Sequence, residues 1–327
     1  MQLTSLLRRL VLNNGAKMPR IGVGTYLLLG DQCQEVIERA IAIGYRHIDT
    51  AWSYENEKAI GSTIHDIEHR GNIGRKQLYI TSKLGRTFFH PRDVKYAVEE
   101  SLDNLQTTYL DMYLIHSPWG MKNHGDGNRK PLKEDGTYDC EAYDLNATWR
   151  AMEEAVKDGH VKSIGLSNFT TKQIQMIVDN GKIVPQNVQF ECHAYYQQNS
   201  LRKFCSDYNI VCTAYSPLGA PGIPDSHQAK SHNKDLQLLE DDIVITIATK
   251  YNRSPAQILL RFLLEKNLAV IPKTSSLQRL EENICVFDFE LEKEDVTLLE
   301  SLDRGLRFFM FEHYKDHPYF PNKNEFF

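Results

Sequence analysis

The chain of 327 residues lacks the features of a membrane-spanning or secreted protein. No apolar run approaches the roughly 20 residues that a helix needs to cross a bilayer, so we expect no membrane span. Arg8 and Arg9 interrupt the apolar residues at the start, which argues against a signal peptide. The six cysteines form no C-x-x-C pair. We therefore expect free thiols in a reducing compartment, the cytoplasm.

An excess of positive charge is also missing. The formal net charge is −5, and 41% hydrophobic with 25% charged residues is ordinary globular composition. Nothing in this balance favours nucleic acid or an anionic membrane as a partner. A small molecule is the expected ligand, and a monomer the default oligomeric state.

A dinucleotide fingerprint is absent as well. The segment Ile21-Gly22-Val23-Gly24-Thr25-Tyr26 predicts a short strand with a glycine-rich end. It lacks the third glycine of G-x-G-x-x-G, and no strand–helix–strand spacing follows it. This counts against a doubly wound nucleotide-binding domain.

What the chain does contain is a regular alternation of short apolar strands and helices. Strands are predicted at 21–26, 45–48, 77–83, 110–115, 161–166, 187–190, 210–214 and 268–271, and helices at 34–43, 57–69, 91–105, 147–157, 171–178, 200–208, 236–250, 255–265, 277–283 and 293–302. Buried parallel strands have this apolar character. Eight such units predict an α/β protein with one (β/α)8 TIM barrel over 1–327, and a pair of doubly wound domains is the alternative.

Four segments stand outside the bare barrel. Residues 1–20 predict a β-hairpin with a tight turn at Asn14-Gly15. Residues 118–144 and 217–233 are polar or rich in Gly and Pro, and each follows a strand, so both are expected to wall a site at the C-terminal face. The aromatic tail, 304–327, either closes that site or is a poorly ordered end.

Four side chains able to do acid–base chemistry follow neighbouring strands. Asp49 and Tyr54 come after the second strand, Lys83 ends the third, and His116 ends the fourth. Since strand ends in a parallel barrel face one rim, we expect these groups to converge. The pKa of a phenol is near 10, and a nearby ammonium favours the phenolate, so Tyr54 is the expected proton donor. Asp49 is expected to pair with Lys83, and His116 to orient a carbonyl oxygen.

Each of these residues alone has an ordinary interpretation. Lys83 would be a surface cation and His116 a hydrogen-bonded core histidine. Their occurrence at successive strand ends favours a common site over chance.

Later strand ends supply groups suited to a nucleotide. Ser167, Asn168 and Gln189 offer hydrogen bonds to an amide, and Tyr215 offers a flat aromatic face for a nicotinamide ring. After the last strand, Lys273 and Arg279 with neighbouring hydroxyls open a helix, which suits a phosphate. The alternative for this last cluster is a solvated helix start.

The same residues carry a close family resemblance. Gly44-Tyr45-Arg46-His47-Ile48-Asp49-Thr50-Ala51, with Tyr54 and Asn56-Glu57, resembles the first signature of the aldo-keto reductases. Ile164 to Phe169 is similar to their central signature, and Ile271 to Thr274, with Arg279 and Asn283, to their last. The match runs in register from about Leu10 to Leu302.

The resemblance implies an NADPH/NADP⁺-dependent enzyme that reduces an aldehyde or ketone. It implies Tyr54 as general acid, with Asp49, Lys83 and His116 completing a catalytic tetrad. The cofactor residues that it implies are Gly24, Thr25, Asp49, Ser167, Asn168, Gln189, Tyr215, Ser216, Leu218, Lys273, Thr274, Ser275, Arg279, Glu282 and Asn283. Lys273, Thr274 and Arg279 would hold the adenosine 2′-phosphate, and two cations there fit NADP(H) better than NAD(H).

The departures from the family pattern concern the substrate. Aldose-reductase-like members commonly have tryptophan where this chain has Tyr26, Gly85 and Ser117. We therefore expect a reshaped pocket lined by Tyr26, Trp52, Tyr54, His116 and Trp119, with tail residues such as Phe308, Phe309 and Phe311 as possible additions. The physiological carbonyl substrate does not follow from the sequence.

Two other functions compete with a reductase. The barrel and nucleotide site also suit a regulatory or structural protein that binds a protein partner without significant turnover. His65-Asp66-Ile67-Glu68-His69 spells the inverted zinc-protease pattern H-x-x-E-H. That motif falls on a helix expected outside the barrel, with no obvious further ligand, so we expect no metal site.

Overall fold

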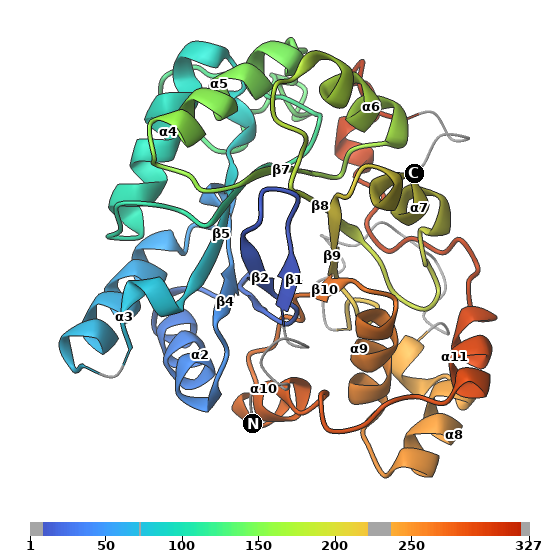
Figure 1. The fold of residues 1–327 in the computed structure, drawn as a ribbon. Coiled ribbons are helices and arrows are strands. Elements are labelled where there is room, and N and C mark those ends of the chain that lie inside the picture. The colour runs from blue at the N-terminus through green and yellow to red at the C-terminus, as the bar shows by residue number, and fades with distance from the viewer. Residues whose placement is uncertain (1–8, 72, 222–236, 322–327) are drawn as a thin grey trace.

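The computed structural model describes residues 9–71, 73–221 and 237–321. Eight parallel strands form a curled sheet whose order follows the chain, β3 to β10, with helices around it (Figure 1). The strands are β3 Val23–Gly24, β4 His47–Asp49, β5 Tyr79–Leu84, β6 Met112–Ile115, β7 Ile164–Ser167, β8 Asn187–Glu191, β9 Val211–Tyr215 and β10 Ala269–Val270. The predicted (β/α)8 barrel is thereby confirmed.

The backbone around β3 closes the barrel against β10. Ile21 forms a parallel bridge with Val270, and the Gly24 N–H donates to the Pro272 carbonyl at 3.2 Å. A Cβ at Gly24 would lie 2.6 Å from the Ile271 carbonyl oxygen, so only glycine allows this approach. First and last strands are thus held together by main-chain hydrogen bonds.

The N-terminal hairpin covers the barrel end at which the strands begin. It consists of β1 Arg9–Val11 and β2 Lys17–Pro19, which pair antiparallel, with Gly15 at φ +83° in the turn. Its buried side chains pack on strand residues that lie mostly at the N-terminal ends of the strands. The cluster comprises Leu10, Leu12, Met18, Tyr79, Met112, Leu114 and Ala269. In Figure 1 the hairpin lies across the centre of the strands. The first eight residues of the predicted hairpin segment lie outside the described ranges.

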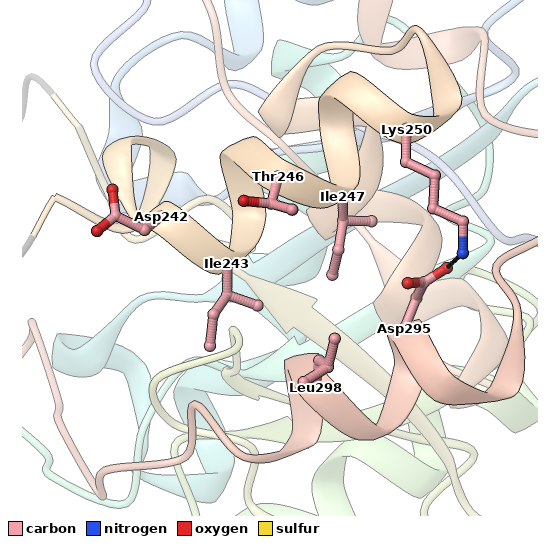
Figure 2. A pocket seen from close by; sticks show the side chains of 7 residues that line it. All are labelled: Asp242, Ile243, Thr246, Ile247, Lys250, Asp295 and Leu298. Carbon is pink, nitrogen blue, oxygen red and sulfur yellow. Dashed lines mark hydrogen bonds and ion pairs between the residues drawn. The ribbon is translucent and has the colours of Figure 1, made fainter.

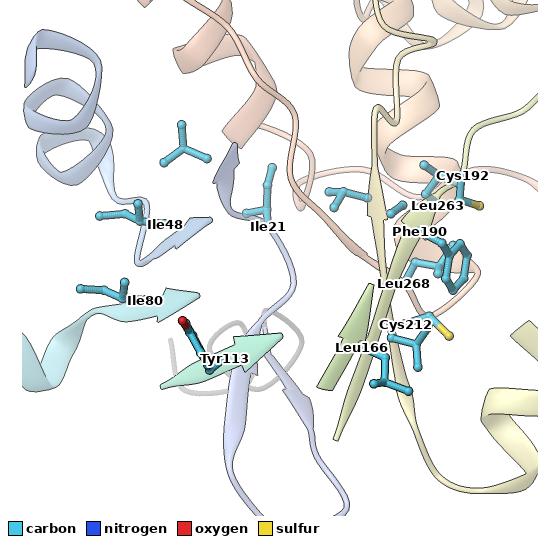
Figure 3. Close-up of a cluster of buried hydrophobic side chains, with 14 of the residues drawn as sticks. Ile21, Ile48, Ile80, Tyr113, Leu166, Phe190, Cys192, Cys212, Leu263 and Leu268 are labelled. Carbon is cyan, nitrogen blue, oxygen red and sulfur yellow. The ribbon is translucent and has the colours of Figure 1, made fainter. Parts of the chain in front are cut away.

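The helices pack their apolar faces on the outside of the sheet. They are α2 Gly30–Ile43, α3 Glu57–His69, α4 Pro91–Asn104, α5 Leu145–Lys157, α6 Thr171–Asn180, α7 Asn199–Asp207, α8 Asp242–Tyr251, α9 Pro255–Glu265, α10 Leu277–Ile284 and α11 Lys293–Glu300. Strand residues such as Ile48, Ile80 and Leu166 share the resulting core with Leu263 of α9 (Figure 3). In the described part of the chain, no helix is both long enough and apolar enough to cross a membrane. All six cysteines are free thiols.

One helix is broken where the sequence predicts continuity. The predicted helix 236–250 is split at Asp241, which separates the 3-10 turn η4 Leu238–Glu240 from α8. Asp241 has extended dihedral angles, and its carboxylate accepts a hydrogen bond from the Ile243 N–H at 3.0 Å. An N-cap aspartate of this kind starts a new helix, which the apolar period alone does not reveal. Residue 236 lies outside the described ranges.

The tail and the loop after β6 pack on each other. Within 118–144, bridges join Met121 to Cys140 and Leu132 to Tyr138. Trp119 of this loop contacts three tail rings, those of Phe311, Tyr314 and Phe320. The tail up to residue 321 is therefore an ordered wall of the barrel rim. Residues 222–233 of the second predicted loop, and 322–327 of the tail, lie outside the described ranges.

Candidate active site

Three of the four predicted catalytic groups meet at a buried ammonium. Lys83 ends β5, and its Nζ donates to Asp49 Oδ1 at 2.5 Å and to the Thr50 carbonyl at 2.8 Å. The Tyr54 hydroxyl, in the 3-10 turn η1 Trp52–Tyr54, lies 3.4 Å from the same nitrogen. The Lys83 and Asp49 side chains are only 1% and 3% exposed. The phenol therefore sits beside a lysine whose charge is balanced by a carboxylate.

His116 lies on the other side of the phenol, directly after β6. Its ring centroid is 5.5 Å from that of Tyr54, and the two planes stand at 74°. The Ser53 hydroxyl is 3.3 Å from His116 Nδ1, and Asn168 Nδ2 donates to the His116 carbonyl at 3.0 Å. When Ser53 donates to Nδ1, Nε2 carries the imidazole proton. A neutral imidazole in that tautomer can donate a hydrogen bond to a carbonyl oxygen.

Burial dominates the protonation of all three groups. It lowers the pKa of Lys83, and the attraction of Asp49 opposes this effect. Burial, followed by the positive charges of Arg86 and Lys83, holds the pKa of His116 well below its ordinary value, so this ring is neutral. Burial and then the Asp49 charge raise the pKa of Tyr54, while Arg86 lowers it.

The direction for Tyr54 is opposite to the one expected from its neighbouring lysine. A raised pKa keeps the proton on the phenol until an acceptor is present, which is the state that a general acid requires. The Lys83 ammonium, 3.4 Å from the hydroxyl, is close enough to favour the phenolate form of Tyr54, but burial has the larger effect on the pKa of this phenol.

The buried side-chain amide of Asn56 holds the turn η1, which bears Tyr54. From the sequence, Asn56 was assigned no separate role. Asn56 Nδ2 donates to the carbonyls of Thr25 and Leu28 at 2.8 and 3.0 Å, and its Oδ1 accepts from the Thr50 hydroxyl at 2.7 Å. Asn56 is 1% exposed. With three bonds satisfied, it fixes the chain on both sides of η1, and hence Tyr54. The sequence alone did not show that this polar residue would be buried.

The residues predicted to hold a nicotinamide form one hydrogen-bonded group. The Tyr215 hydroxyl donates to Asn168 Oδ1 at 2.7 Å, and Asn168 Nδ2 lies 3.1 Å from the Ser167 hydroxyl. Gln189 Nε2 donates to Asp49 Oδ2 at 2.7 Å, which links this group to the catalytic pair. Ser167, Asn168 and Gln189 are all buried, and Tyr215 is half-buried at the end of β9.

The remaining residues predicted beside the nicotinamide and pyrophosphate differ in exposure. Gly24 and Thr25 are buried, and the Thr25 hydroxyl donates to the Asp49 carbonyl at 3.0 Å. Ser216 and Leu218 are half-buried after β9, with Ser216 at φ +49°. This positive φ marks a turn directly after the strand, where the backbone leaves the rim.

The start of α10 has the composition of a phosphate site. Lys273, Ser275 and Arg279 are exposed, and no carboxylate of the described chain lies within 4.0 Å of either cation. Thr274 Oγ1 accepts from the Ser276 N–H at 3.0 Å, which shapes the turn before the helix. Two cations without counter-ions beside a helix N-terminus match the charge of a phosphate, so these residues fit the group that NADP carries and NAD lacks. Further along α10, Glu282 is half-buried and Asn283 buried.

The predicted substrate residues divide into rim and core. The rings of Tyr26 and Tyr54 lie 5.0 Å apart, and both side chains are half-buried at the rim. Trp52 is 2% exposed and Trp119 is fully buried. In this structure the two tryptophans support the wall of the site and present almost no surface to a substrate.

Gly85 explains where the Trp52 ring goes. A Cβ at Gly85 would lie 2.5 Å from Trp52 Cε3, so the indole fills the space beside this glycine. Phe88 packs on the indole at 4.8 Å, and the Arg129 guanidinium lies 4.3 Å from the ring centroid while donating to the Trp52 carbonyl. Arg129 belongs to the 118–144 loop, so that loop holds the turn bearing Tyr54. Sequence reasoning gave Arg129 no role.

The H-x-x-E-H motif lies on α3, outside the barrel. The rings of His65 and His69 are 4.1 Å apart, and His65 Nδ1 lies 3.9 Å from Asp66. Across the described ranges no three His, Cys, Asp or Glu side chains are grouped to hold a metal ion.

A separate hollow lies between α8 and α11 (Figure 2). Its lining residues are Asp242, Ile243, Thr246, Ile247, Lys250, Asp295 and Leu298. Lys250 reaches Asp295 at 2.7 Å along one side. These helices lie outside the barrel, so the hollow is not part of the site at the strand ends.

Comparison with known proteins assigns this barrel to a class of oxidoreductases that act on carbonyl groups. Residues 20–304 match the model of the Aldo/keto reductase family, which covers most of the chain. The chain belongs to this family, and is thus an oxidoreductase of the NADP-dependent aldo-keto reductase type.

Individual relatives are similar over almost the whole length. "Aldo-keto reductase family 1 member C4" of Macaca fascicularis is 39% identical, over 98% of both chains. "Aldo-keto reductase family 1 member A1" of Sus scrofa is 40% identical, over 91% of this chain and 90% of that one. The solved aldose reductase of Schistosoma japonicum superimposes with a TM-score of 0.89 at 37% identity, covering 97% of this chain and 99% of that one.

Proposed function

We propose that the protein reduces an aldehyde or ketone to an alcohol with NADPH, and that Tyr54 is the general acid. The observation that carries the proposal is the grouping of three side chains beside the His116 ring. Lys83 Nζ lies 3.4 Å from the Tyr54 hydroxyl and 2.5 Å from Asp49 Oδ1. Bound NADPH supplies the hydride. Every other element of the reaction falls to this chain's own side chains.

His116 donates a hydrogen bond to the carbonyl oxygen and so orients it toward the phenol. Tyr54 transfers its hydroxyl proton to that oxygen as negative charge develops there. Lys83, held by Asp49, stabilises the resulting phenolate. The low exposure of Lys83 and Asp49 keeps competing water away from the pair.

The cofactor site follows from the later strand ends. Ser167, Asn168 and Gln189 would hold the carboxamide, and Tyr215 would lie against the nicotinamide. Asn168 and Gln189 already bond to protein groups, so the Ser167 hydroxyl and Gln189 Oε1 are the groups left to meet it. Ser216 and Leu218 would follow the pyrophosphate.

The adenosine end would meet the start of α10. Lys273, Thr274, Ser275 and Arg279 would take the 2′-phosphate, with Glu282 and Asn283 at the adenine. These two cations, which have no carboxylate partner among the described residues, are the reason for proposing NADPH over NADH. Fluorescence titration of the wild-type protein with both nucleotides tests this choice, and tighter binding of NADH would contradict it.

The decisive test of the chemistry is Tyr54→Phe. We expect the variant to bind NADPH with unchanged affinity and to lose roughly 10²–10⁴-fold in kcat with an uncharged aromatic aldehyde, because only the transferable proton is removed. Tyr96→Phe is the matched control, since Tyr96 on α4 is 59% exposed and its hydroxyl makes no hydrogen bond to the described residues, while its ring, which contacts Phe88, is kept. Equal kcat in wild type and Tyr54→Phe would refute Tyr54 as the acid.

The same assay separates the reductase from a protein that binds NADPH and a protein partner without turnover. Such a protein would bind the nucleotide and leave the aldehyde unchanged already as wild type. We further propose that residues 1–327 act as one domain and as a cytoplasmic monomer. Cell fractionation and sedimentation of the purified protein test the last two points.

A further inference from the structure

We propose that Arg86 recognises a carboxylate on the substrate, so that the enzyme prefers carbonyl compounds bearing this anionic group. The inference rests on the proposed reductase function and names the substrate class of the same site. Arg86 is half-buried in the 3-10 turn η3 Arg86–Phe88, three residues after Lys83 and on the same rim. Sequence reasoning singled out its neighbour Gly85 but not Arg86.

The guanidinium is held in place from two elements. Arg86 Nε donates to the Ser117 hydroxyl at 2.8 Å, and Ser117 directly follows His116. The guanidinium carbon lies 5.2 Å from the ring centroid of Tyr314 in the tail. The Arg86 carbonyl also accepts from the Met121 N–H at 2.9 Å. A long, flexible side chain is thus fixed beside the group that orients the substrate carbonyl.

This charge has no counter-ion in the described parts of the chain. No Asp or Glu oxygen there lies within 4.0 Å of Arg86, and its two terminal nitrogens make no hydrogen bond with described residues. Of the other partly buried arginines, Arg75 and Arg261 pair with Asp111 at 2.8 Å and with Glu265 at 2.7 Å, whereas Arg46 donates from Nη1 to the carbonyls of Ile41 and Tyr45. A guanidinium with both terminal nitrogens available is suited to the two oxygens of a carboxylate.

The charge also acts on the reaction centre. Arg86 contributes to lowering the pKa of His116, ahead of Lys83 in effect, and it opposes the rise in the pKa of Tyr54 and of Tyr26. These effects place the cation within electrostatic reach of both groups that meet the carbonyl oxygen. A ligand that reaches Tyr54 and His116 therefore also comes under the influence of Arg86.

A role for Arg86 in cofactor binding is disfavoured by its position. Arg86 follows β5, whereas the proposed nucleotide residues other than Asp49 of β4 lie near β3 or follow β7 to β10. The substrate side of the rim, next to Tyr54 and His116, is where the guanidinium lies. The anion that it meets is thus one carried by the substrate.

The test compares two aldehydes that differ by one charge, 4-carboxybenzaldehyde and methyl 4-formylbenzoate. For Arg86→Gln we expect the ratio of kcat/KM for the acid over the ester to fall about 10- to 100-fold, mainly through KM of the acid, as for the loss of a hydrogen-bonded charge. Arg86→Lys keeps the charge without the fork, so it should fall between wild type and Arg86→Gln. It also serves as the test variant should Arg86→Gln not fold.

The matched control is Arg92→Gln, which removes the same charge from α4. The Arg92 side chain is 77% exposed and lies 3.5 Å from Asp93, so the acid-to-ester ratio should match wild type. An equal loss for both aldehydes in Arg86→Gln would mean that Arg86 serves the chemistry or the shape of the site, and no loss for either would mean that Arg86 does not bind the substrate. Either result would overturn this inference and leave the proposed reductase function standing. If wild type reduced neither aldehyde, the proposed function would fail, and the inference with it.

Discussion

Replacing Asp49 with Asn should destabilise the protein far more than the same change on its surface. Asp49 and Lys83 are almost fully buried and 2.5 Å apart, so the variant leaves an ammonium in the barrel without its counter-charge. Breaking a buried ion pair from one side costs about 3–5 kcal/mol of unfolding free energy. We expect the lower end, about 3 kcal/mol, because the Thr50 carbonyl at 2.8 Å and the new amide oxygen still accept from Lys83.

Urea unfolding at pH 7, followed by far-UV circular dichroism, measures this cost. The control is Asp207→Asn, which breaks the pair with Lys203, 2.9 Å apart and 59% and 75% exposed. Exposed pairs four residues apart on a helix contribute only about 0.3–0.5 kcal/mol. If the Asp49 variant lost no more stability than the Asp207 variant, the claim that burial makes this pair critical would be refuted.

The pH dependence gives a second check on the same reasoning. Burial already lowers the pKa of Lys83, and Asp49 is the main group that opposes this. Without Asp49 the folded-state pKa falls further below the unfolded value, so the unfolded chain binds more protons and stability rises with pH. The deficit of Asp49→Asn should therefore shrink between pH 7 and pH 9. Asp49→Asn combined with Lys83→Met should regain part of the loss, since no charge is left unpaired.

Two further predictions concern stability. Gly85→Ala should lower the free energy of unfolding by about 1–3 kcal/mol, and with it Tm and kcat, because its Cβ would lie 2.5 Å from Trp52 in the turn that carries Tyr54. In Gly74→Ala the nearest atom to the new Cβ is 4.0 Å away, so neither Tm nor kcat should fall. Equal Tm values for the two variants would contradict the packing argument. Burial lowers the pKa of His47 from 6.5 to about 4. Between these pH values the unfolded state binds a proton at this ring and the folded state does not. About 3 kcal/mol of unfolding free energy should therefore be lost as pH falls from 6.5 to 4. The difference in unfolding free energy between wild type and His47→Gln across this range measures the effect, and a difference that does not change with pH would refute it.

The architecture was predictable because local patterns and the tertiary structure agree. The helices 57–69 and 255–265 were predicted with the bounds that the structure gives them, each with a capping or acidic first turn. Strand 21–26 shrinks to Val23–Gly24, because the rest of the segment pairs irregularly to close the barrel. Asp241 breaks a predicted helix through one side-chain hydrogen bond, which periodicity does not register.

The candidate site was predictable in its residues but less so in its electrostatics. Strand-end position alone brought Asp49, Tyr54 and Lys83 together. The sign of the Tyr54 pKa shift did not follow, because burial outweighs a neighbouring charge and the degree of burial is a property of the folded chain. Arg86 and Arg129 were missed for a similar reason: each acts across elements distant in sequence, through Ser117 and Trp52.

The hairpin that covers one end of the barrel has a consequence for how such a protein can diverge. Leu10, Leu12 and Met18 seal the base with contacts that involve none of the rim segments. Insertions or substitutions in 118–144 therefore do not alter the packing of the hairpin on the strands. New ligand preferences can arise in this loop while the barrel stays folded. Sequence differences among relatives should accordingly be concentrated in the loops at the rim and be rare in the hairpin.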